Sequence, residues 1–294
     1  MPRPDELGDR IKGYEARETE RRAMKGVPLV ARVDGRSFSK FTRGMTRPFD
    51  PDFSGLMIEV AKYLVEQTHA RVAYVQSDEI TLVLDPFSPK KDRDRDGDTD
   101  PDKPQERATA RHGGFGETGF MFDGRFQKLN SVLAGLATAR FMKGALHLWP
   151  ERCDKQLPVF DCRVFEVPNR EEAAWTVAWR ETDAVKNAVS MACRAYYSPK
   201  EMLGKSSSEM QEMLFQKGVN FNDYPARFRR GSYVQRRTVM KELAPEVLAR
   251  IPEGRRPTGP VMRSETVVLD VPPIRRVENW IEVLLDGADP VLRQ

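Results

Sequence analysis

The sequence of 294 residues contains only three cysteines and three histidines. Cys153, Cys162 and Cys193 are an odd number without CxxC spacing, which argues against a disulfide framework and against a cysteine zinc site. The histidines lie too far apart in the sequence to form a metal-ligand motif. We therefore expect buried thiols, and oxygen ligands for any metal.

Long apolar runs are also missing. No run approaches the roughly eighteen apolar residues of a membrane span, and the first residues lack the apolar core of a signal peptide. The sequence is 39% hydrophobic and 31% charged. These features predict a soluble, cytoplasmic globular protein without a membrane partner. The net charge of +4 is too small to predict nucleic-acid binding by itself.

Two segments, residues 30–38 and 74–84, set carboxylates beside apolar, β-branched runs that are typical of buried strands. Between them, apolar residues at helical spacing predict a helix over 53–66. Strand, helix and strand in this order favour an α/β or α+β domain. An ionised carboxylate beside such strands needs a compensating partner.

Asp34 and Asp78 are the two carboxylates of interest. If they converge on neighbouring strands, they can hold two divalent cations through hard oxygen ligands. Such a pair of ions suits nucleotidyl transfer, in which one ion activates a hydroxyl and the other binds the triphosphate. The alternative is that Asp34 and Gly35 only open a turn and that Asp78 and Glu79 end a solvated strand.

Further elements follow from composition and periodicity. We expect an exposed helix over residues 8–24, a polar charged insertion over about 86–119, a helix over 126–141, a strand over 159–165 and one or two helices over 169–195. Trp175 and Trp179 share one face of the last helix, where core packing is favoured over base stacking.

Basic residues crowd the region 227–241, with aromatic residues between them. Arg227, Arg229 and Arg230 are candidates for contact with an RNA backbone, and the alternative is a solvated surface. The tail after residue 241 contains a possible strand over 266–269 and an apolar segment over 280–285. Either element can dock on the main domain.

Several short motifs together resemble the tRNA-histidine guanylyltransferase family in order and spacing. They are the sequences at residues 34–38, 47–48, 76–79, 160–164, 221–225 and 229–231. The resemblance extends from about residue 9 to residue 237. It is specific because several unrelated motifs recur in one order.

This resemblance implies a catalytic region over 1–245, with the 86–119 insertion, and a C-terminal extension over 246–294. The implied fold is α+β and similar to the palm of nucleotide polymerases, with a mixed or antiparallel sheet flanked by helices. The implied activity is magnesium-dependent addition of nucleotides, in the 3′-to-5′ direction, to tRNA 5′ ends. ATP or GTP would be substrates, two Mg²⁺ ions the cofactors, and a homotetramer the assembly.

The resemblance also implies roles for individual residues. Asp34 and Asp78 would bridge the metals, the Gly35 carbonyl would add a ligand, and Glu79 is a weaker catalytic candidate. The implied nucleotide-binding residues are Arg36, Ser37, Phe38, Ser39, Arg47, Ser77, Lys128 and Asn187. Arg47 stands where the family commonly has lysine, and its guanidinium can still bind phosphate.

The sequence departs from the eukaryotic pattern at residues 185–191, where a His-Ile-Asn-Asn-Leu-Tyr-Asn signature is reduced to Asn187. This loss resembles the bacterial and archaeal guanylyltransferase-like branch, which is associated with template-dependent repair of 5′-truncated tRNAs. The alternatives are guanylylation of tRNA-histidine, a palm-type nucleotide cyclase that acts on free nucleotides, and a non-catalytic RNA-binding protein.

Overall fold

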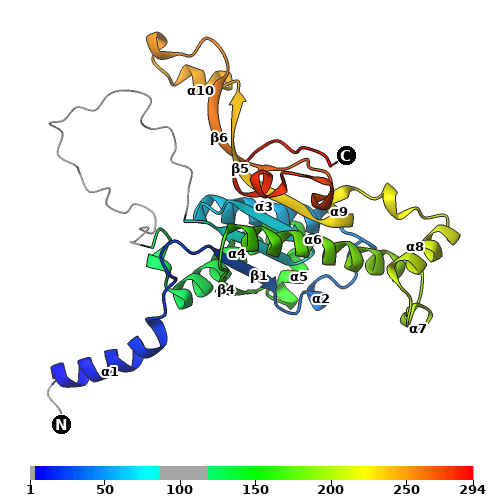
Figure 1. Ribbon diagram of the computed structural model, residues 1–294, viewed down its shortest axis with the longest axis horizontal. Helices are drawn as coiled ribbons and strands as arrows, with labels where there is room; N and C mark the ends of the chain where they lie inside the picture. The colour runs from blue at the N-terminus through cyan, green and yellow to red at the C-terminus, as the bar shows by residue number, and fades with distance from the viewer. Residues whose placement is uncertain (1–3, 87–117, 294) are drawn as a thin grey trace.

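The computed structural model describes residues 4–86 and 118–293, and a six-stranded sheet lies at its centre (Figure 1). The strands are β1 (Leu29–Gly35), β2 (Val72–Gln76), β3 (Glu79–Leu84), β4 (Phe160–Glu166), β5 (Ser232–Lys241) and β6 (Val261–Val268). They lie in the order β4-β1-β3-β2-β5-β6, and every neighbouring pair is antiparallel. The α+β prediction is confirmed. The insertion predicted over 86–119 falls almost entirely outside the described residues.

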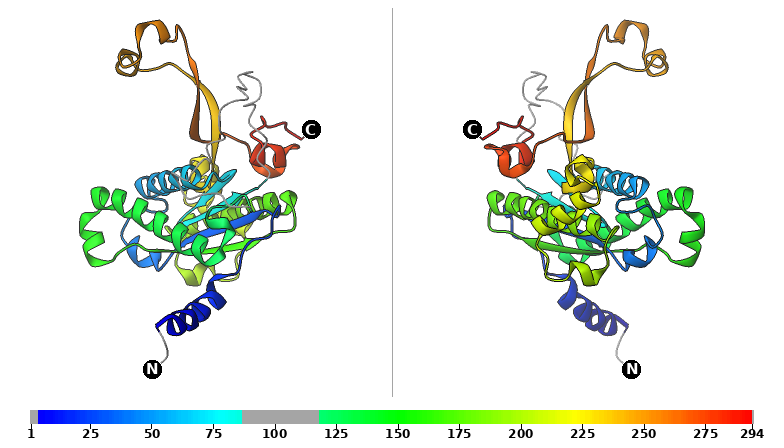
Figure 2. Two further views of the ribbon diagram at one scale, coloured as in Figure 1. Left: turned by 90° about the vertical axis from the view of Figure 1, so that its left-hand side faces the viewer. Right: turned by 90° about the vertical axis from the view of Figure 1, so that its right-hand side faces the viewer.

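Helices lie on both faces of this sheet (Figures 1 and 2). The α-helices are α1 (Pro4–Thr19), α2 (Phe38–Phe41), α3 (Pro51–Thr68), α4 (Phe126–Leu148), α5 (Pro150–Lys155), α6 (Arg170–Cys193), α7 (Pro199–Met202), α8 (Ser207–Gln216), α9 (Ala226–Arg230), α10 (Pro245–Ala249) and α11 (Trp280–Leu285). Short 3-10 turns are η1 (Phe122–Gly124), η2 (Phe221–Asp223), η3 (Glu253–Arg255) and η4 (Ile274–Arg276). In the part of the chain that the structure describes, no helix is long and apolar enough to cross a membrane.

Helices α3 and α4 cover one face of the sheet and form the first core. Helix α3 begins two residues earlier than the sequence predicts, because the Asp50 side chain accepts hydrogen bonds from the backbone N–H groups of Asp52 and Phe53 and Pro51 fits the first helical position. Helix α4 continues seven residues past the predicted end at Phe141, and Ala145 is buried in this extension.

Helix α6, η4 and α11 cover part of the opposite face and form a second core. The apolar segment predicted over 280–285 is α11, which docks there as expected. Strand β6 is longer than predicted, because it pairs with β5 along its whole length, from Val268 opposite Val234 to Val261 opposite Lys241.

The prediction of core packing for Trp175 and Trp179 is wrong. Trp175 is 50% exposed and Trp179 is 56% exposed. The face of α6 that packs on the sheet carries small residues, including Ala174 and Ala178, so the helix lies close to the strands and the large rings remain at its rim. The Trp175 ring contacts Trp280 of α11 at a centroid distance of 4.6 Å.

Two parts project from the body (Figures 1 and 2): helix α1, and the β5–β6 hairpin with α10 at its far end. Helix α1 is mostly exposed, as predicted, but it ends at Thr19 rather than at residue 24. The chain leaves the helix because Ala23 is buried in the first core and its N–H donates to the Gly124 carbonyl at 2.9 Å.

A buried carboxylate, Glu181, joins α6 to β5, α9 and the C-terminal segment. Its Oε2 accepts hydrogen bonds from the Tyr233 hydroxyl at 2.7 Å and from the Ile274 N–H at 3.0 Å. Its Oε1 lies 3.6 Å from the Arg230 guanidinium, and both side chains are largely buried. Burial and the Glu181 charge raise the pKa of Tyr233 well above its ordinary value, so the phenol stays a donor. This network fixes the C-terminal segment on the sheet.

We expect Glu181→Ala to lower the free energy of unfolding by about 3–5 kcal/mol, because it leaves the Arg230 charge buried without its partner. Urea denaturation of the variant and the wild type measures this difference. Glu171→Ala, an exposed position on the same helix, is the control and should cost less than about 1 kcal/mol. Equal losses in the two variants would contradict the assigned role of the Glu181 network.

Candidate active site

Asp34 and Asp78 lie beside each other where the inner strands β1 and β3 meet the β2–β3 turn, at one end of the strands. We call this end of the sheet the acidic edge. Asp34 is the penultimate residue of β1, and the N–H of the next residue, Gly35, donates to the Asp78 carbonyl at 3.1 Å. A Cβ on Gly35 would lie 2.9 Å from the Asp78 Cβ and 2.5 Å from the Phe38 ring, so only glycine permits this approach. Asp78 belongs to the β2–β3 turn rather than to a strand, which corrects the expectation of two strand-borne aspartates.

A row of carboxylates crosses three strands at this edge. Asp34 lies directly opposite Glu79 of β3 on one side and Asp161 of β4 on the other. Residues directly opposite in a sheet project from the same face, so the three carboxylates share the face that α6 partly covers. Their mutual repulsion requires nearby cations.

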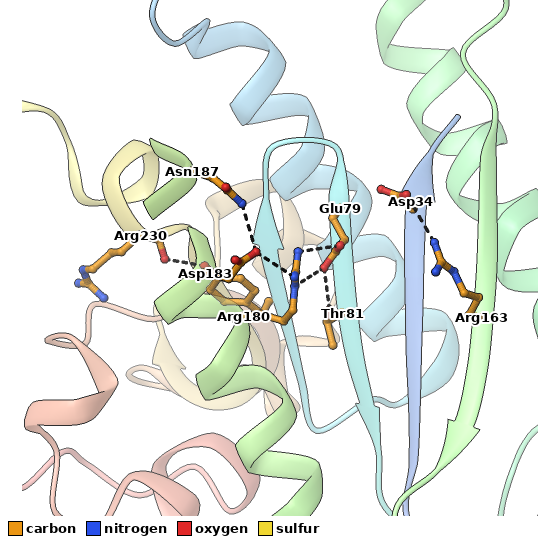
Figure 3. A network of polar contacts seen from close by, with 9 residues as sticks. Asp34, Glu79, Thr81, Arg163, Arg180, Asp183, Asn187 and Arg230 are labelled. Atoms are coloured by element: carbon orange, nitrogen blue, oxygen red, sulfur yellow. Dashed lines mark hydrogen bonds and ion pairs between the residues drawn. The ribbon is translucent and has the colours of Figure 1, made fainter. Parts of the chain in front are cut away.

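Two arginines supply that compensation (Figure 3). The Arg163 guanidinium on β4 lies 3.7 Å from the Asp34 carboxylate. Arg180 on α6 forms an ion pair with Glu79: its Nη2 donates to Oε2 at 2.8 Å, its Nε lies 2.6 Å from Oε1, and its Nη1 lies 3.1 Å from Asp183. Sequence reasoning missed both arginines. The alternation of Asp161 and Arg163 along one strand was the available signal, since it places them on one face.

The electrostatic surroundings of Asp78 and Glu79, two of the acidic neighbours of Asp34, differ. Burial raises the pKa of Asp78, the Asp34 charge raises it further, and hydrogen bonds from its own backbone and from Ser77 oppose the shift. Burial also raises the pKa of Glu79, and the Arg180 charge opposes this shift most strongly. Among the described residues, no lysine or arginine forms an ion pair with Asp78. Glu79 is thus held by Arg180, while Asp78 is the carboxylate that a bound cation would relieve most.

The donor atoms at this edge fit a hard divalent cation. Within residues 4–86 and 118–293, no cluster of three histidine, cysteine, aspartate or glutamate side chains is arranged to hold a metal. A site at Asp34 and Asp78 would therefore use two carboxylates with backbone carbonyl oxygens, such as that of Gly35. Carboxylate and carbonyl oxygens are the ligands that Mg²⁺ prefers.

Strained backbone flanks both aspartates. Ser37 has φ 58° and Ser77 has φ 51°, in the left-handed region that non-glycine residues rarely adopt. Each such residue costs roughly 1–3 kcal/mol, and strain of this kind concentrates at functional sites. Phe38 is buried in an aromatic cluster with Phe141 and Phe160, so its backbone, not its ring, is available to a ligand.

A cavity of about 390 Å³ begins at Ser77, the residue before Asp78, and neither Asp34 nor Asp78 lines it. Ser39 and Ser77 line it, and so do four arginines: Arg43, Arg47, Arg194 and Arg227. Asp50 is the one carboxylate in its lining, and that carboxylate already accepts hydrogen bonds from three backbone N–H groups. Apolar side chains such as Phe53 and Met57 form the rest of the wall. The cavity offers positive charge for phosphates and an apolar surface for a base.

The remaining predicted residues are not in this cavity. Arg36 is exposed just beyond β1. The Lys128 ammonium lies over the Phe122 ring at 5.7 Å, near the start of α4. Asn187 on α6 donates to Asp183 at 3.1 Å, beside the Arg180–Glu79 pair (Figure 3). Arg229 donates to the Tyr224 carbonyl, at 2.6 Å.

Comparison with known proteins identifies the family. The family model described as "Thg1: tRNAHis guanylyltransferase" matches residues 8–168, more than half of the chain. The chain belongs to this family. As a member of the tRNAHis guanylyltransferase family it is a nucleotidyltransferase, and the resemblance seen in the sequence motifs is confirmed.

Relatives within the family extend the match beyond that region. A probable tRNA(His) guanylyltransferase of Dictyostelium discoideum is 27% identical over 74% of this chain and 78% of its own length. A bacterial tRNA(His) guanylyltransferase (Thg1)-like protein in complex with ATP has a TM-score of 0.70 and 27% identity, over 95% of this chain and 98% of that chain. A second structure of a bacterial Thg1-like protein, in complex with GTP, has a TM-score of 0.63 and 26% identity, over 94% and 99%. The palm-like fold implied by the sequence is confirmed by these likenesses.

We expect Asp78→Asn to stabilise the metal-free protein at pH 7. The folded-state pKa of Asp78 is raised, so its ionised form opposes folding at neutral pH, and the uncharged amide removes that effect. The gain should shrink as the pH falls through the folded-state pKa, and it should vanish below the ordinary aspartate pKa of about 3.9, where Asp78 is protonated in both states. Thermal unfolding in EDTA across this pH range measures it. A gain that does not depend on pH would contradict the electrostatic cause.

Proposed function

We propose that the chain adds nucleotides in the 3′-to-5′ direction to the 5′ ends of tRNA or tRNA-like RNA, with two Mg²⁺ ions and with ATP or GTP as the activating nucleotide. The observation that carries this proposal is the contact of Gly35 with Asp78, which brings Asp34 and Asp78 together, and the cavity with four arginines that begins at the adjacent Ser77. Family membership and the likeness to bacterial Thg1-like structures in complex with ATP and with GTP support it.

The proposed reaction has two steps at this site. A 5′-monophosphate end of the RNA first attacks the α-phosphate of ATP or GTP, which releases pyrophosphate and leaves the nucleotide joined to the RNA 5′ end. The 3′-hydroxyl of the incoming nucleoside triphosphate then attacks the RNA 5′-phosphate and expels the activating nucleotide as a monophosphate. When bound, the magnesium ions would supply charge neutralisation and a more acidic attacking hydroxyl.

The residues of the chain have separate tasks in this scheme. Asp34, Asp78 and the Gly35 carbonyl would hold the ions. Arg47 and Arg227 would bind the polyphosphate in the cavity, where a guanidinium offers two parallel hydrogen bonds to a phosphate. Arg180 acts as a positioning residue, because it holds the Glu79 carboxylate at 2.6 Å and keeps its charge compensated beside Asp34.

Template-dependent repair is the form of this activity that residues 185–191 favour. Val185 and Ala188 replace polar positions of the eukaryotic signature, and the Ala188 side chain is fully buried in the core between α6, α8 and η2. Neither side chain offers a polar group for recognition of one particular base. Pairing with the opposite RNA strand would then choose the nucleotide.

Asp34→Asn and Asp78→Asn should each reduce nucleotide addition by about a hundredfold or more, because each removes charge from the proposed metal site without changing side-chain size. Incorporation of labelled nucleotide into a 5′-truncated tRNA, with magnesium titrated, measures this loss. Asp154→Asn, an exposed position on α5, is the control and should retain wild-type activity. A near-normal rate in either site variant would remove the basis for the two-metal assignment.

On a tRNA that lacks its first 5′ nucleotide, the enzyme should add whichever base pairs with the opposing nucleotide. Changing the opposing base should change the product, which sequencing of the extended 5′ ends reads directly. Addition of guanosine regardless of the opposing base, with strong preference for tRNA-histidine, would replace the repair proposal by guanylylation. Conversion of free nucleotide without RNA would instead indicate a cyclase.

A further inference from the structure

A second, larger cavity lies on the other side of α6 from the acidic edge. Its volume is about 910 Å³, which is near the upper end of the roughly 300–1,000 Å³ that ligand sites usually occupy. It is lined by α6, α9, η2 and the C-terminal segment, including Arg293. We call it the tryptophan–arginine cleft. None of the residues assigned to metal or nucleotide binding lines it.

The cleft is strongly basic. Its cationic lining residues are Lys186, Arg229, Arg230, Arg275, Arg276 and Arg293, and the single carboxylate is Glu181. Glu181 is already paired with Arg230, as the buried network requires. Arg275 and Arg276 are exposed, and among the described residues neither forms an ion pair with a carboxylate. Five further cations gathered from four chain segments favour a ligand with several phosphates spread along its length.

Tryptophan is also concentrated in this cleft. Three of the four tryptophans of the chain, Trp175, Trp179 and Trp280, line this one cleft. Trp280 is buried, but half or more of the surface of Trp175 and Trp179 remains exposed. Exposed tryptophan rings provide flat surfaces for stacking, and base stacking on such rings stabilises single-stranded nucleic acid.

Helix α6 connects the cleft to the candidate active site. Arg180, Asp183 and Asn187 extend toward Glu79, whereas Trp175, Trp179 and Lys186 occupy the neighbouring face of the same helix. Figure 3 shows Arg180 and Asp183 on the Glu79 side, and Arg230 beyond the helix. The cleft and the acidic edge are therefore lined by different faces of one helix.

We propose that the tryptophan–arginine cleft binds a short single-stranded RNA segment, the unpaired 3′ tail that adjoins the 5′ end of a tRNA substrate, by stacking bases on Trp175 and Trp179 and pairing phosphates with Arg275 and Arg276. The identity of the tail rests on the proposed function, because the tail is the single-stranded part of a tRNA next to its 5′ end. The cleft holds the strand opposite the reacting end and so positions the substrate.

Binding of RNA in EDTA without nucleotide tests this proposal independently of catalysis. A fluorescently labelled 5′-truncated tRNA is compared with the same RNA without its 3′ tail. We expect removal of the tail to weaken wild-type binding by about tenfold, the effect of losing stacked bases. In Trp179→Ala and in the double variant Arg275→Ala/Arg276→Ala, the two RNAs should bind with nearly equal affinity.

Matched variants distinguish the cleft from general effects. Trp179→Phe keeps an aromatic ring and should retain most of the dependence on the tail. Phe215→Ala, which removes another exposed ring, and Lys143→Ala/Lys200→Ala, which removes two exposed charges, should behave as wild type. The Arg275→Ala/Arg276→Ala variant should also show a salt dependence lower by roughly 1.4 units of logarithmic slope, for two lost contacts to single-stranded phosphates.

Any of the following results would overturn the proposal. They are equal binding of both RNAs by the wild type, unchanged tail dependence in the cleft variants, and altered oligomeric state in Trp179→Ala by light scattering, which would make the cleft an interface between copies. Competition by ATP as strong as by a tail oligonucleotide would assign the cleft to free nucleotide instead. If the protein fails to extend tRNA but tail dependence persists, the proposed function fails while the cleft assignment stands.

Discussion

Repulsion among carboxylates at one sheet edge is the constraint on which the arrangement of the site depends. Asp161, Asp34 and Glu79 face the same way on adjacent strands, with Asp78 in the next turn. Arg163 and Arg180 reduce that repulsion from two sides, and the second of them ties α6 to the sheet. Asp78 forms no ion pair with a lysine or arginine among the described residues, so no basic side chain offsets the effect of burial on its pKa.

The same helix that supplies Arg180 organises the rest of the molecule. Its small residues lie against the strands, Glu181 fixes β5 and the C-terminal segment, and its large rings stay at the rim. Three consecutive residues of α6 thus have different surroundings. Trp179 lines the cleft, Arg180 pairs with Glu79 at the acidic edge, and Glu181 belongs to the buried network. Core packing and the lining of a cavity thus fall on neighbouring faces of one helix.

Much of the fold was predictable from local pattern. The buried strands around Asp34 and Glu79, the helix between them and the docking of residues 280–285 follow from apolar spacing, which depends on neighbours in sequence. The exposed tryptophans were mispredicted, because their spacing is equally typical of a core face, and only the close approach of the alanine face to the sheet decides between the two. The spacing of Asp161 and Arg163 could have indicated that both lie on one face of a strand. Arg180 was missed because a pairing between a helix and a distant strand leaves no mark in either segment alone.

Helix α6 also packs in two separate cores along its length, so its two halves are supported by different neighbours. Up to Ala184 it packs in the second core, while Ala188, Val189 and Ala192 belong to the core between α6, α8 and η2, with Leu214 and Phe221. Local unfolding usually starts at helix ends and releases the least supported segment first. Fraying of α6 from its C-terminal end would release Met191 and Arg194, which line the smaller cavity, yet leave Arg180 on Glu79. Amide exchange would then be faster near Arg194 than near Arg180, so the wall of the smaller cavity could open while the ion pairs of the acidic edge stay in place.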